Sequence, residues 1–154
     1  MKAEALGIRV VLARFGIILA REGGALPKMM LPFKIGVGGK LGSGQQWMSW
    51  VTLEDVVGIL RLAIENASVR SAINIVAPQP LQNAEFTKVL AKVMHRPALF
   101  LAPAFALRLA LGEMADALLL SSQRVLPVAL EKLGYRFLRA DLPSALNTVL
   151  MKDT

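Results

Sequence analysis

The chain has 154 residues, a length that suits one compact domain with a hydrophobic core. Its hydrophobic content of 55% and mean hydropathy of +0.51 are high for a solitary soluble domain, so we expect part of its apolar surface to face a partner. The absence of cysteine excludes a disulfide scaffold and thiolate metal sites, and is typical of a cytoplasmic or organelle-matrix protein.

Membrane insertion and secretion are not expected. Arg14 interrupts the apolar residues 10–20, and several charged side chains interrupt residues 102–120. Neither segment supplies the roughly 18 uninterrupted apolar residues that a membrane span needs. Glu4 and Arg9 stand where a signal peptide would be apolar.

The net charge of +7 is concentrated at the start of the chain. Residues 1–40 carry seven basic side chains but only Glu4 and Glu22 as acids. This bias suits a phosphate-bearing cofactor or an anionic substrate, and a solvated basic face is the alternative. Nucleic acid is not an expected partner, because no aromatic and basic platform accompanies these residues.

The first predicted strand is residues 8–15, which follow a short helix that ends before Gly7. The run is apolar and rich in β-branched residues, as in a strand buried on both faces of a parallel sheet. Arg14 lies at its carboxyl end, where ligands collect in open α/β sheets. We therefore regard Arg14 as a candidate ligand contact, with a structural ion pair to a carboxylate as the alternative.

Residues 36–55 form the most unusual stretch of the chain, after a predicted helix over residues 25–33. They read GVGGKLGSGQQWMSWVTLED and contain five glycines and both tryptophans. Glycine allows close backbone approach to a ligand, so the stretch is a candidate binding site, or else a hairpin that closes a sheet edge. We expect a hairpin with its tip at Gly42–Gly44, a strand over residues 46–53 and a helix from Val56 to about residue 66. The spacing matches neither Gly-x-Gly-x-x-Gly nor a P-loop.

The chain beyond residue 77 reads as a second, mostly helical region. A strand is predicted over residues 72–77, and Pro78 and Pro80 mark a boundary between domains at residues 1–77 and 78–154. Asn83 is a candidate cap for a helix to residue 94, and residues 96–101 should be extended. Further helices are expected over residues 103–111, 113–120, 127–134 and from residue 141 onward.

No metal site or catalytic residue is predicted in this chain. His95 is the single histidine and has no second ligand at metal spacing. Glu113 and Asp116 share a predicted helix face, where exposed charge is a commoner explanation than acid–base chemistry. Gln123 and Arg124 form a polar island that we expect to order a loop.

Long segments of the sequence resemble one family. GGALPKMMLPFKIGVGGKLGSGQQWMSWVTLEDVV, NIVAPQPLQNAEFTKVLAKVMHRP and LGEMADALLLSSQRVLPVALEKLGYRF resemble the C-terminal half of NAD(P)-dependent epimerase/dehydratase-like proteins. These belong to the extended short-chain dehydrogenase/reductase superfamily, and the likeness is to its "epimerase family" subgroup with a C-terminal domain of unknown function. The resemblance implies an α/β fold: the C-terminal part of a Rossmann-like domain with a small mixed α+β substrate lobe.

The resemblance also implies an N-terminal nucleotide-binding half that is absent from this chain. That half carries a glycine-rich first turn and a Tyr-x-x-x-Lys catalytic pair in the family. Tyr135 is the single tyrosine here, and Arg139 stands where the lysine would be. NAD or NADP is the implied cofactor of the full-length protein, and we expect weak or no binding by this chain alone.

The implied site residues lie in two groups. The resemblance places the end of the first strand beside the nicotinamide and the glycine-rich stretch beside the substrate, which gives cofactor contacts at Arg14, Gly16 and Ile17 and substrate contacts at Gly44, Gln46, Trp47 and Trp50. Family members that act on sugar nucleotides carry a phosphate-binding arginine where this chain has Met48. With Trp47 beside it, Met48 indicates a more apolar substrate pocket.

We therefore predict the substrate-binding half of an NAD(P)-dependent oxidoreductase or epimerase-like protein, inactive in isolation. Its partners would be the missing half, or a second copy through an apolar face, and a small-molecule substrate. The alternative is a non-catalytic interaction module or a subunit that pairs with a separate nucleotide-binding chain. Substrate identity, NAD against NADP, and oligomeric state stay open.

Overall fold

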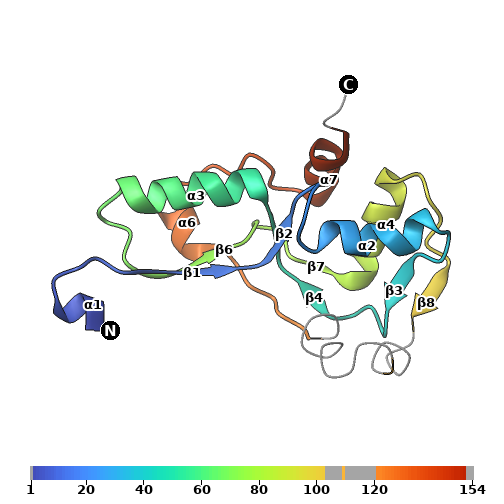
Figure 1. Cartoon of the computed structure of the whole chain (residues 1–154), viewed down its shortest axis with the longest axis horizontal. Coiled ribbons are helices and arrows are strands. Elements are labelled where there is room, and N and C mark those ends of the chain that lie inside the picture. The colour runs from blue at the N-terminus through green and yellow to red at the C-terminus, as the bar shows by residue number, and fades with distance from the viewer. Residues whose placement is uncertain (1, 103–108, 110–120, 152–154) are drawn as a thin grey trace.

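The computed structural model describes residues 2–102, 109 and 121–151. Helices and short strands alternate along most of this length (Figure 1). In chain order the elements are α1 (Lys2–Ala5), β1 (Val11–Phe15), β2 (Ile17–Leu19), α2 (Leu26–Lys34), β3 (Gly39–Leu41), β4 (Trp47–Met48), β5 (Trp50–Thr52), α3 (Leu53–Glu65), β6 (Ser71–Ile75), β7 (Leu81–Gln82), α4 (Asn83–Val93), β8 (Phe100–Ala102), α6 (Val128–Lys132) and α7 (Leu142–Met151).

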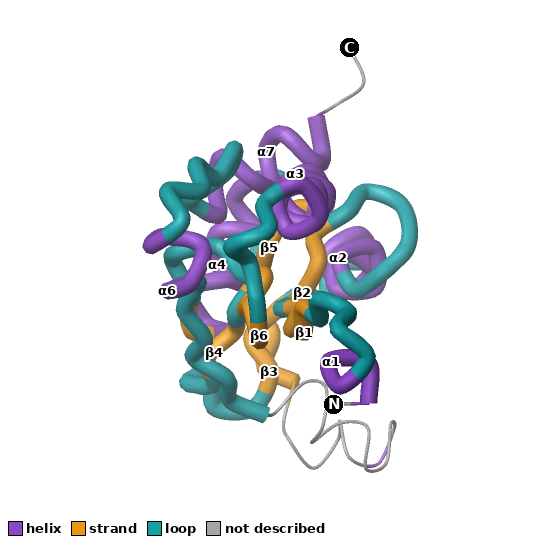
Figure 2. The backbone as a smooth tube through the Cα atoms, turned by 90° about the vertical axis from the view of Figure 1, so that its left-hand side faces the viewer, coloured by secondary structure: helices purple, strands orange, loops and turns teal. Residues whose placement is uncertain are grey.

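The strands pair mainly in parallel, as an α/β fold requires. β1 pairs with β6, β2 with β5 and β3 with β8 in parallel, whereas β4 and β7 are antiparallel. The first two pairs are joined by the backbone, because the Gly16 N–H donates to Ile75 O over 3.2 Å and the Ala77 N–H donates to Trp50 O over 2.6 Å. Figure 2 shows the strands in the middle of the molecule, with α3 above them and α2 and α4 on opposite sides.

One buried cluster, here called the α3 cluster, lies between α3, β6 and α6. The predicted inner face of α3 is confirmed at Val56, Ile59 and Ala63, whereas Leu60 is 37% exposed. The helix begins at Leu53, three residues before the predicted start at Val56, because Thr52 Oγ1 caps it by accepting a hydrogen bond from the Asp55 N–H. The members of the cluster are Val51, Val56, Ile59, Ala63, Val69, Ile73, Ile75 and Leu130.

A second buried cluster, the α4 cluster, packs α2, α4 and α7 around β2 and β5. It joins residues from both sides of the predicted boundary at residues 77 and 78, so the two regions share one core. The boundary itself stays a prediction. The members of this cluster are Leu19, Leu26, Phe33, Trp50, Ala77, Phe86, Leu90, Ala91, Leu142, Ala145 and Leu146.

Strand β1 is not buried on both faces, contrary to the prediction. Val11 and Ala13 pack against the α3 cluster, but Leu12 is 43% and Phe15 50% exposed. Within the described residues β1 pairs with β6 alone, so its other edge is open. The face of β1 that carries Leu12 therefore lacks a cover, and Phe15 is exposed at the end of the strand.

The glycine-rich turn is present, but the predicted hairpin is not. Gly42 and Gly44 have φ values of 56° and 75°, and the Gly44 N–H donates to Leu41 O over 3.0 Å. The flanking strands β3 and β4 pair with β8 and β7 instead of with each other. The turn chemistry predicted the bend correctly, whereas the pairing depends on strands far away in the sequence.

The cap of α4 differs from the prediction by one residue. Gln82 is the capping residue, and its backbone N–H donates to Glu85 Oε2 over 3.4 Å. Asn83 is buried and its Oδ1 instead accepts from the Leu41 N–H over 2.9 Å. The side chain of Asn83 therefore ties β3 to α4.

Other predictions follow the elements closely, with one group untested. Gly134, with a φ of 72°, follows the C-terminal end of α6 as predicted. At the start of α7, the Ser144 N–H donates to Asp141 Oδ1. The helices expected over residues 103–111 and 113–120, with Glu113 and Asp116, lie outside the described residues. Among the helices that are described, none has the length and apolarity needed to cross a membrane.

Candidate functional site

The bend between β1 and β2 holds two of the predicted cofactor contacts. A Cβ at Gly16 would lie 2.6 Å from Ser49 O and 2.8 Å from Val76 Cγ1, so only glycine fits there. The Ile17 N–H donates to Ser49 O over 2.8 Å, and its side chain packs against the α4 cluster. Packing alone is thus sufficient to explain Gly16, and cofactor contact by Gly16 and Ile17 stays a prediction.

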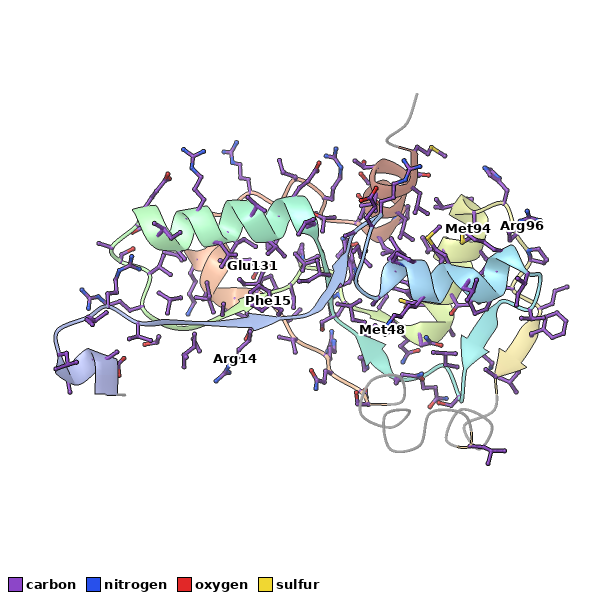
Figure 3. The ribbon with its side chains drawn as sticks, in the orientation of Figure 1. Arg14, Phe15, Met48, Met94, Arg96 and Glu131 are labelled. Carbon is purple, nitrogen blue, oxygen red and sulfur yellow. The ribbon has the colours of Figure 1, made fainter. Side chains whose placement is uncertain are left out.

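Arg14 projects from β1 into solvent. Figure 3 shows its side chain pointing away from α3. The structural ion pair considered as an alternative is not found among the described residues, where Arg14 has no carboxylate partner. An exposed guanidinium at a strand end, with no carboxylate beside it in the described part of the chain, is available to an anion.

Two predicted substrate contacts hold the glycine-rich turn against α4. Gly44 O accepts from the Ala84 N–H over 2.9 Å, and a Cβ on Gly44 would lie 3.0 Å from Ala84 Cβ. Gln46 is 7% exposed, and its Nε2 donates to Leu41 O over 3.1 Å. Packing and hydrogen bonding within the fold are therefore sufficient to explain both residues.

Trp50 lies in the core instead of lining an open site. Its side chain is 0% exposed, belongs to the α4 cluster, and donates from Nε1 to Gln79 O over 2.9 Å. Met48 also faces inward: it packs against the same cluster, and its sulfur accepts from Asn83 Nδ2 over 3.4 Å. The predicted role of Trp50 as a substrate contact is thus not supported by its position.

Trp47 is half-buried and is bound to a loop that is distant in the sequence. We call residues 121–126 the Arg124 loop. The Trp47 N–H donates to Ser122 Oγ over 3.0 Å, and Trp47 O accepts from the Gln123 N–H over 3.1 Å. The guanidinium carbon of Arg124 lies 4.8 Å from the centre of the Trp47 ring. This distance is within the range of a cation–π contact.

The Arg124 loop is fastened at two further points. Ser49 Oγ donates to Gln123 O over 2.9 Å and accepts from the Val125 N–H over 2.9 Å. Asn74 Nδ2 donates to Leu126 O over 3.2 Å. The prediction that Gln123 and Arg124 order a loop is consistent with these contacts, but the pairing of Arg124 with Trp47 could not be inferred from the sequence.

Arg14, Trp47 and the Arg124 loop together border one edge of the molecule. Asn74 connects them, because it is the register partner of Arg14 in the β1–β6 pair and bonds the loop through its side chain. Gly44, Gln46 and Trp50 do not join this edge. One guanidinium group beside an indole face, with a second on the strand pair that bonds the same loop, can hold an anion or a planar group, and supplies no acid–base pair.

Asp55 organises the region behind this edge. Its side chain is 0% exposed, and it accepts hydrogen bonds from Tyr135 Oη at 3.2 Å and from the Leu138 and Arg139 N–H groups at 2.8 and 3.3 Å. Burial, and then Asp55, raise the pKa of Tyr135 to about 12. Tyr135 is therefore a positioned structural group, and nothing in its setting activates it as a base.

In the described part of the chain, neither a surface hollow nor a cluster of metal-binding side chains indicates another site. One shallow hollow lies beside Glu4, Arg9 and Arg70, and another beside Thr52 and Val149. Neither includes a predicted site residue. No cluster of His, Cys, Asp or Glu among the residues described could hold a metal ion.

Comparisons with known proteins extend this picture. Residues 102–149 match a domain of unknown function, DUF1731. The epimerase family protein YfhF of Bacillus subtilis is 45% identical over 147 residues, which cover 96% of this chain and 48% of the relative. The epimerase family protein ML0860 of Mycobacterium leprae is 42% identical over 147 residues, with the same two shares. The chain spans about half the length of the curated relatives it matches.

Solved structures agree in fold. The human epimerase family protein SDR39U1, solved with NADPH, matches with a TM-score of 0.88 and 35% identity over 94% of this chain and 49% of that one. A nucleoside-diphosphate sugar epimerase from Corynebacterium glutamicum gives a TM-score of 0.74 and 34% identity over 98% of this chain and 29% of that one. The UDP-glucose 4-epimerase of Thermus thermophilus, at 14% identity, TM-score 0.70, and coverage of 99% and 50%, shows the fold alone. The chain thus has an α/β fold like that of NAD(P)-dependent epimerases and short-chain dehydrogenases, with DUF1731 at its C-terminal end.

Proposed function

We propose that this chain is the substrate-binding half of an NAD(P)-dependent oxidoreductase or epimerase-like protein. A nucleotide-binding half, on the same polypeptide or on a separate one, would complete it. The similar human structure holds NADPH, and the matched region is 49% of that chain. That likeness supports a cofactor site completed by residues outside this chain.

The observation that carries the proposal is the open side of β1. Strands of a parallel sheet are normally covered on both faces and paired on both edges. Leu12 and Phe15 are 43% and 50% exposed, and the described chain pairs β1 with β6 alone. One more parallel strand and a covering helix would bury this apolar surface.

A second uncovered surface lies on α3. Its outward face carries Leu53, Val57, Leu60 and Ile64, which are 49%, 60%, 37% and 75% exposed. The spacing of these residues places them in one stripe along the helix, beside the buried face that carries Val56, Ile59 and Ala63. An apolar stripe of this length supports a protein interface.

In the completed protein, Arg14, Gly16 and Ile17 would lie beside the NAD or NADP, and Trp47 would lie on the substrate side. The reaction would be reversible hydride transfer, with Tyr and Lys supplied by the other half. Tyr135 does not substitute for that tyrosine, because its hydroxyl is committed to Asp55 and its pKa is raised instead of lowered. A cytoplasmic or organelle-matrix location is part of this proposal.

Calorimetric titration tests the proposal. NADH and NADPH would be titrated into the purified chain, after light scattering has established its oligomeric state. The same titration would follow addition of the N-terminal half of the Bacillus subtilis relative. We expect no measurable binding by the chain alone, because a pyrophosphate site needs a glycine-rich turn at a helix N-terminus. Micromolar binding by a monomer of this chain alone would contradict the half-protein proposal.

The alternative is a non-catalytic interaction module or subunit, which the same open surfaces favour. The added half discriminates between them. If it forms a complex that binds NADPH and reduces or oxidises a substrate, the chain acts in catalysis. A complex with no nucleotide binding would favour the module.

A further inference from the structure

The contact between Arg124 and Trp47 is built into the fold. Three backbone or hydroxyl bonds from Trp47 and Ser49 hold the Arg124 loop directly beside the ring, at 2.9 to 3.1 Å. All the loop residues except Val125, which is partly buried, have exposed side chains. The hydrogen bonds of the loop therefore hold Arg124 next to the Trp47 ring, so the contact does not depend on the side chain alone.

No described carboxylate neutralises the charge of Arg124. Across residues 2–102, 109 and 121–151, the guanidinium has no carboxylate partner. Stacking on an indole uses the face of a guanidinium and leaves the N–H groups at its rim free for a bidentate anion. Arg14 lies on β1, which pairs with β6, and Asn74 of β6 bonds the Arg124 loop. Arg14 also has no carboxylate partner among the described residues.

The side chains around Arg124 also define which way a ligand would approach. Met48, next to Trp47, points into the α4 cluster and is bound to Asn83. Trp47 therefore presents its ring on the opposite side of β4, toward the Arg124 loop and solvent. A ligand on this side would meet an indole, the guanidinium rim of Arg124 and the positive potential of Arg14.

We propose that Arg124, stacked on Trp47, is an anion-binding residue, and that the substrate of this protein carries a carboxylate or a phosphate bound there. The assignment of the anion to the substrate rests on the proposed function. Anion binding itself is a property of this chain and does not need the nucleotide-binding half. The site takes one oxyanion with an apolar or planar body beside Trp47.

Nuclear magnetic resonance of the ¹⁵N-labelled chain tests the site, because the chain has only two tryptophans. Inorganic phosphate and benzoate would be titrated separately, with sodium chloride keeping the ionic strength constant. We expect the Trp47 indole N–H signal, assigned with Trp47→Phe, to shift saturably. The Trp50 signal should stay in place because that indole is buried and bound to Gln79 O. The anion that saturates at the lower concentration names the substrate class.

Arg124→Gln is the decisive variant, and Arg61→Gln is its control with the same change of charge. Arg61 is exposed on α3, where it pairs with Glu65. Arg124→Gln should weaken binding at least about tenfold, Arg14→Gln should weaken it about two- to threefold, and Arg61→Gln should leave it unchanged. An unmoved Trp50 signal in each variant shows that the fold is intact.

Three results would overturn the inference: no saturable shift with either anion, equal binding by Arg124→Gln, or equal weakening by Arg61→Gln. None of these touches the proposed cofactor half, which the NADPH titration tests. Conversely, an anion site lost in Arg124→Gln would stand even if no nucleotide-binding half ever restored NADPH binding.

Discussion

The two ends of this molecule differ in how completely their strands are enclosed. In the α4 cluster, α2, α4 and α7 surround β2 and β5, and Leu19 of β2 is 0% exposed. In the α3 cluster, helices cover one face of the β1–β6 pair, and Leu12 of β1 is 43% exposed. Part of the surplus of apolar residues is therefore exposed on β1 and α3, and another part is exposed elsewhere, as on α2 and β8. Exposed apolar surface on these well-formed elements indicates an interface with a partner.

The strongest disturbance should come from Asp55, which joins α3 to residues 135–139. Asp55→Ala would leave the part-buried Leu138 and Arg139 N–H groups and the Tyr135 hydroxyl without their acceptor. We expect a loss of about 3–5 kcal/mol in the free energy of unfolding, measured by urea denaturation. Asp55→Asn keeps one acceptor oxygen and should cost less. A loss below about 1 kcal/mol for the alanine variant would show that the segment after Tyr135 is held by other contacts.

The comparison itself can be tested by one substitution made in both regions. Leu90→Ala, at a side chain that is 1% exposed in the α4 cluster, should cost about 2–5 kcal/mol in the free energy of unfolding. Leu12→Ala, on the open face of β1, should cost less than about 1 kcal/mol. Equal costs in chemical denaturation would mean that β1 is covered in solution, and light scattering would then show whether a second copy covers it.

Gly58 and Tyr135 provide a finer test within the α3 region. A Cβ at Gly58 would lie 2.6 Å from the Tyr135 hydroxyl. We expect Gly58→Ala to destabilise the chain by about 1–2 kcal/mol, although alanine is the better helix former. In the Tyr135→Phe background the same change should be neutral or stabilising, because the nearest remaining ring atom lies 3.6 Å away. Additive effects in this double-mutant cycle would contradict the contact.

The titration of Tyr135 should be directly visible, because it is the single tyrosine. Its pKa is raised from 10.0 to about 12, so the folded chain keeps the phenol proton that the unfolded chain loses. The resulting stabilisation is complete below pH 10 and is lost as the pH rises toward 12. Phenolate absorbance should therefore appear at higher pH in the folded chain than in urea. A folded-state pKa at or below 10 would contradict the buried bond to Asp55.

The smallest effect on stability is expected at the open stripe of α3. Ile64→Lys changes a side chain that is 75% exposed and should alter the free energy of unfolding by no more than about 0.5 kcal/mol. It should nevertheless reduce self-association in light scattering if the stripe is an interface. Leu31→Lys, on α2 and 58% exposed, makes the same change elsewhere. An equal reduction by both variants would indicate a general charge effect.

The sequence predicted local structure well and distant pairing poorly. The helices α2, α3 and α4 and the positive φ of Gly42 and Gly44 follow from periodicity, caps and turn chemistry. The pairing of β3 with β8 could not be predicted, because about sixty residues separate the two strands. Local sequence features predict a turn, but they do not predict which strands will pair.

The candidate site shows the same limit. Trp50 and Trp47 are three residues apart in a stretch that suggested binding, yet one is in the core and the other borders an open edge. Which of them is exposed depends on the break between β4 and β5 at Ser49, and on the loop that Ser49 binds. Arg124 was visible only as a polar island, because its partner lies far away in the sequence.

The hydrogen bonds of Asp55 also limit where recombination can divide this chain without loss of stability. The carboxyl group belongs to α3, whereas the Leu138 and Arg139 N–H groups belong to the region that matches DUF1731. A recombination event between them would leave a buried acceptor without donors on one product and part-buried donors without an acceptor on the other. The edge of DUF1731 is therefore a boundary of sequence similarity, and the two parts should be inherited together as one gene segment.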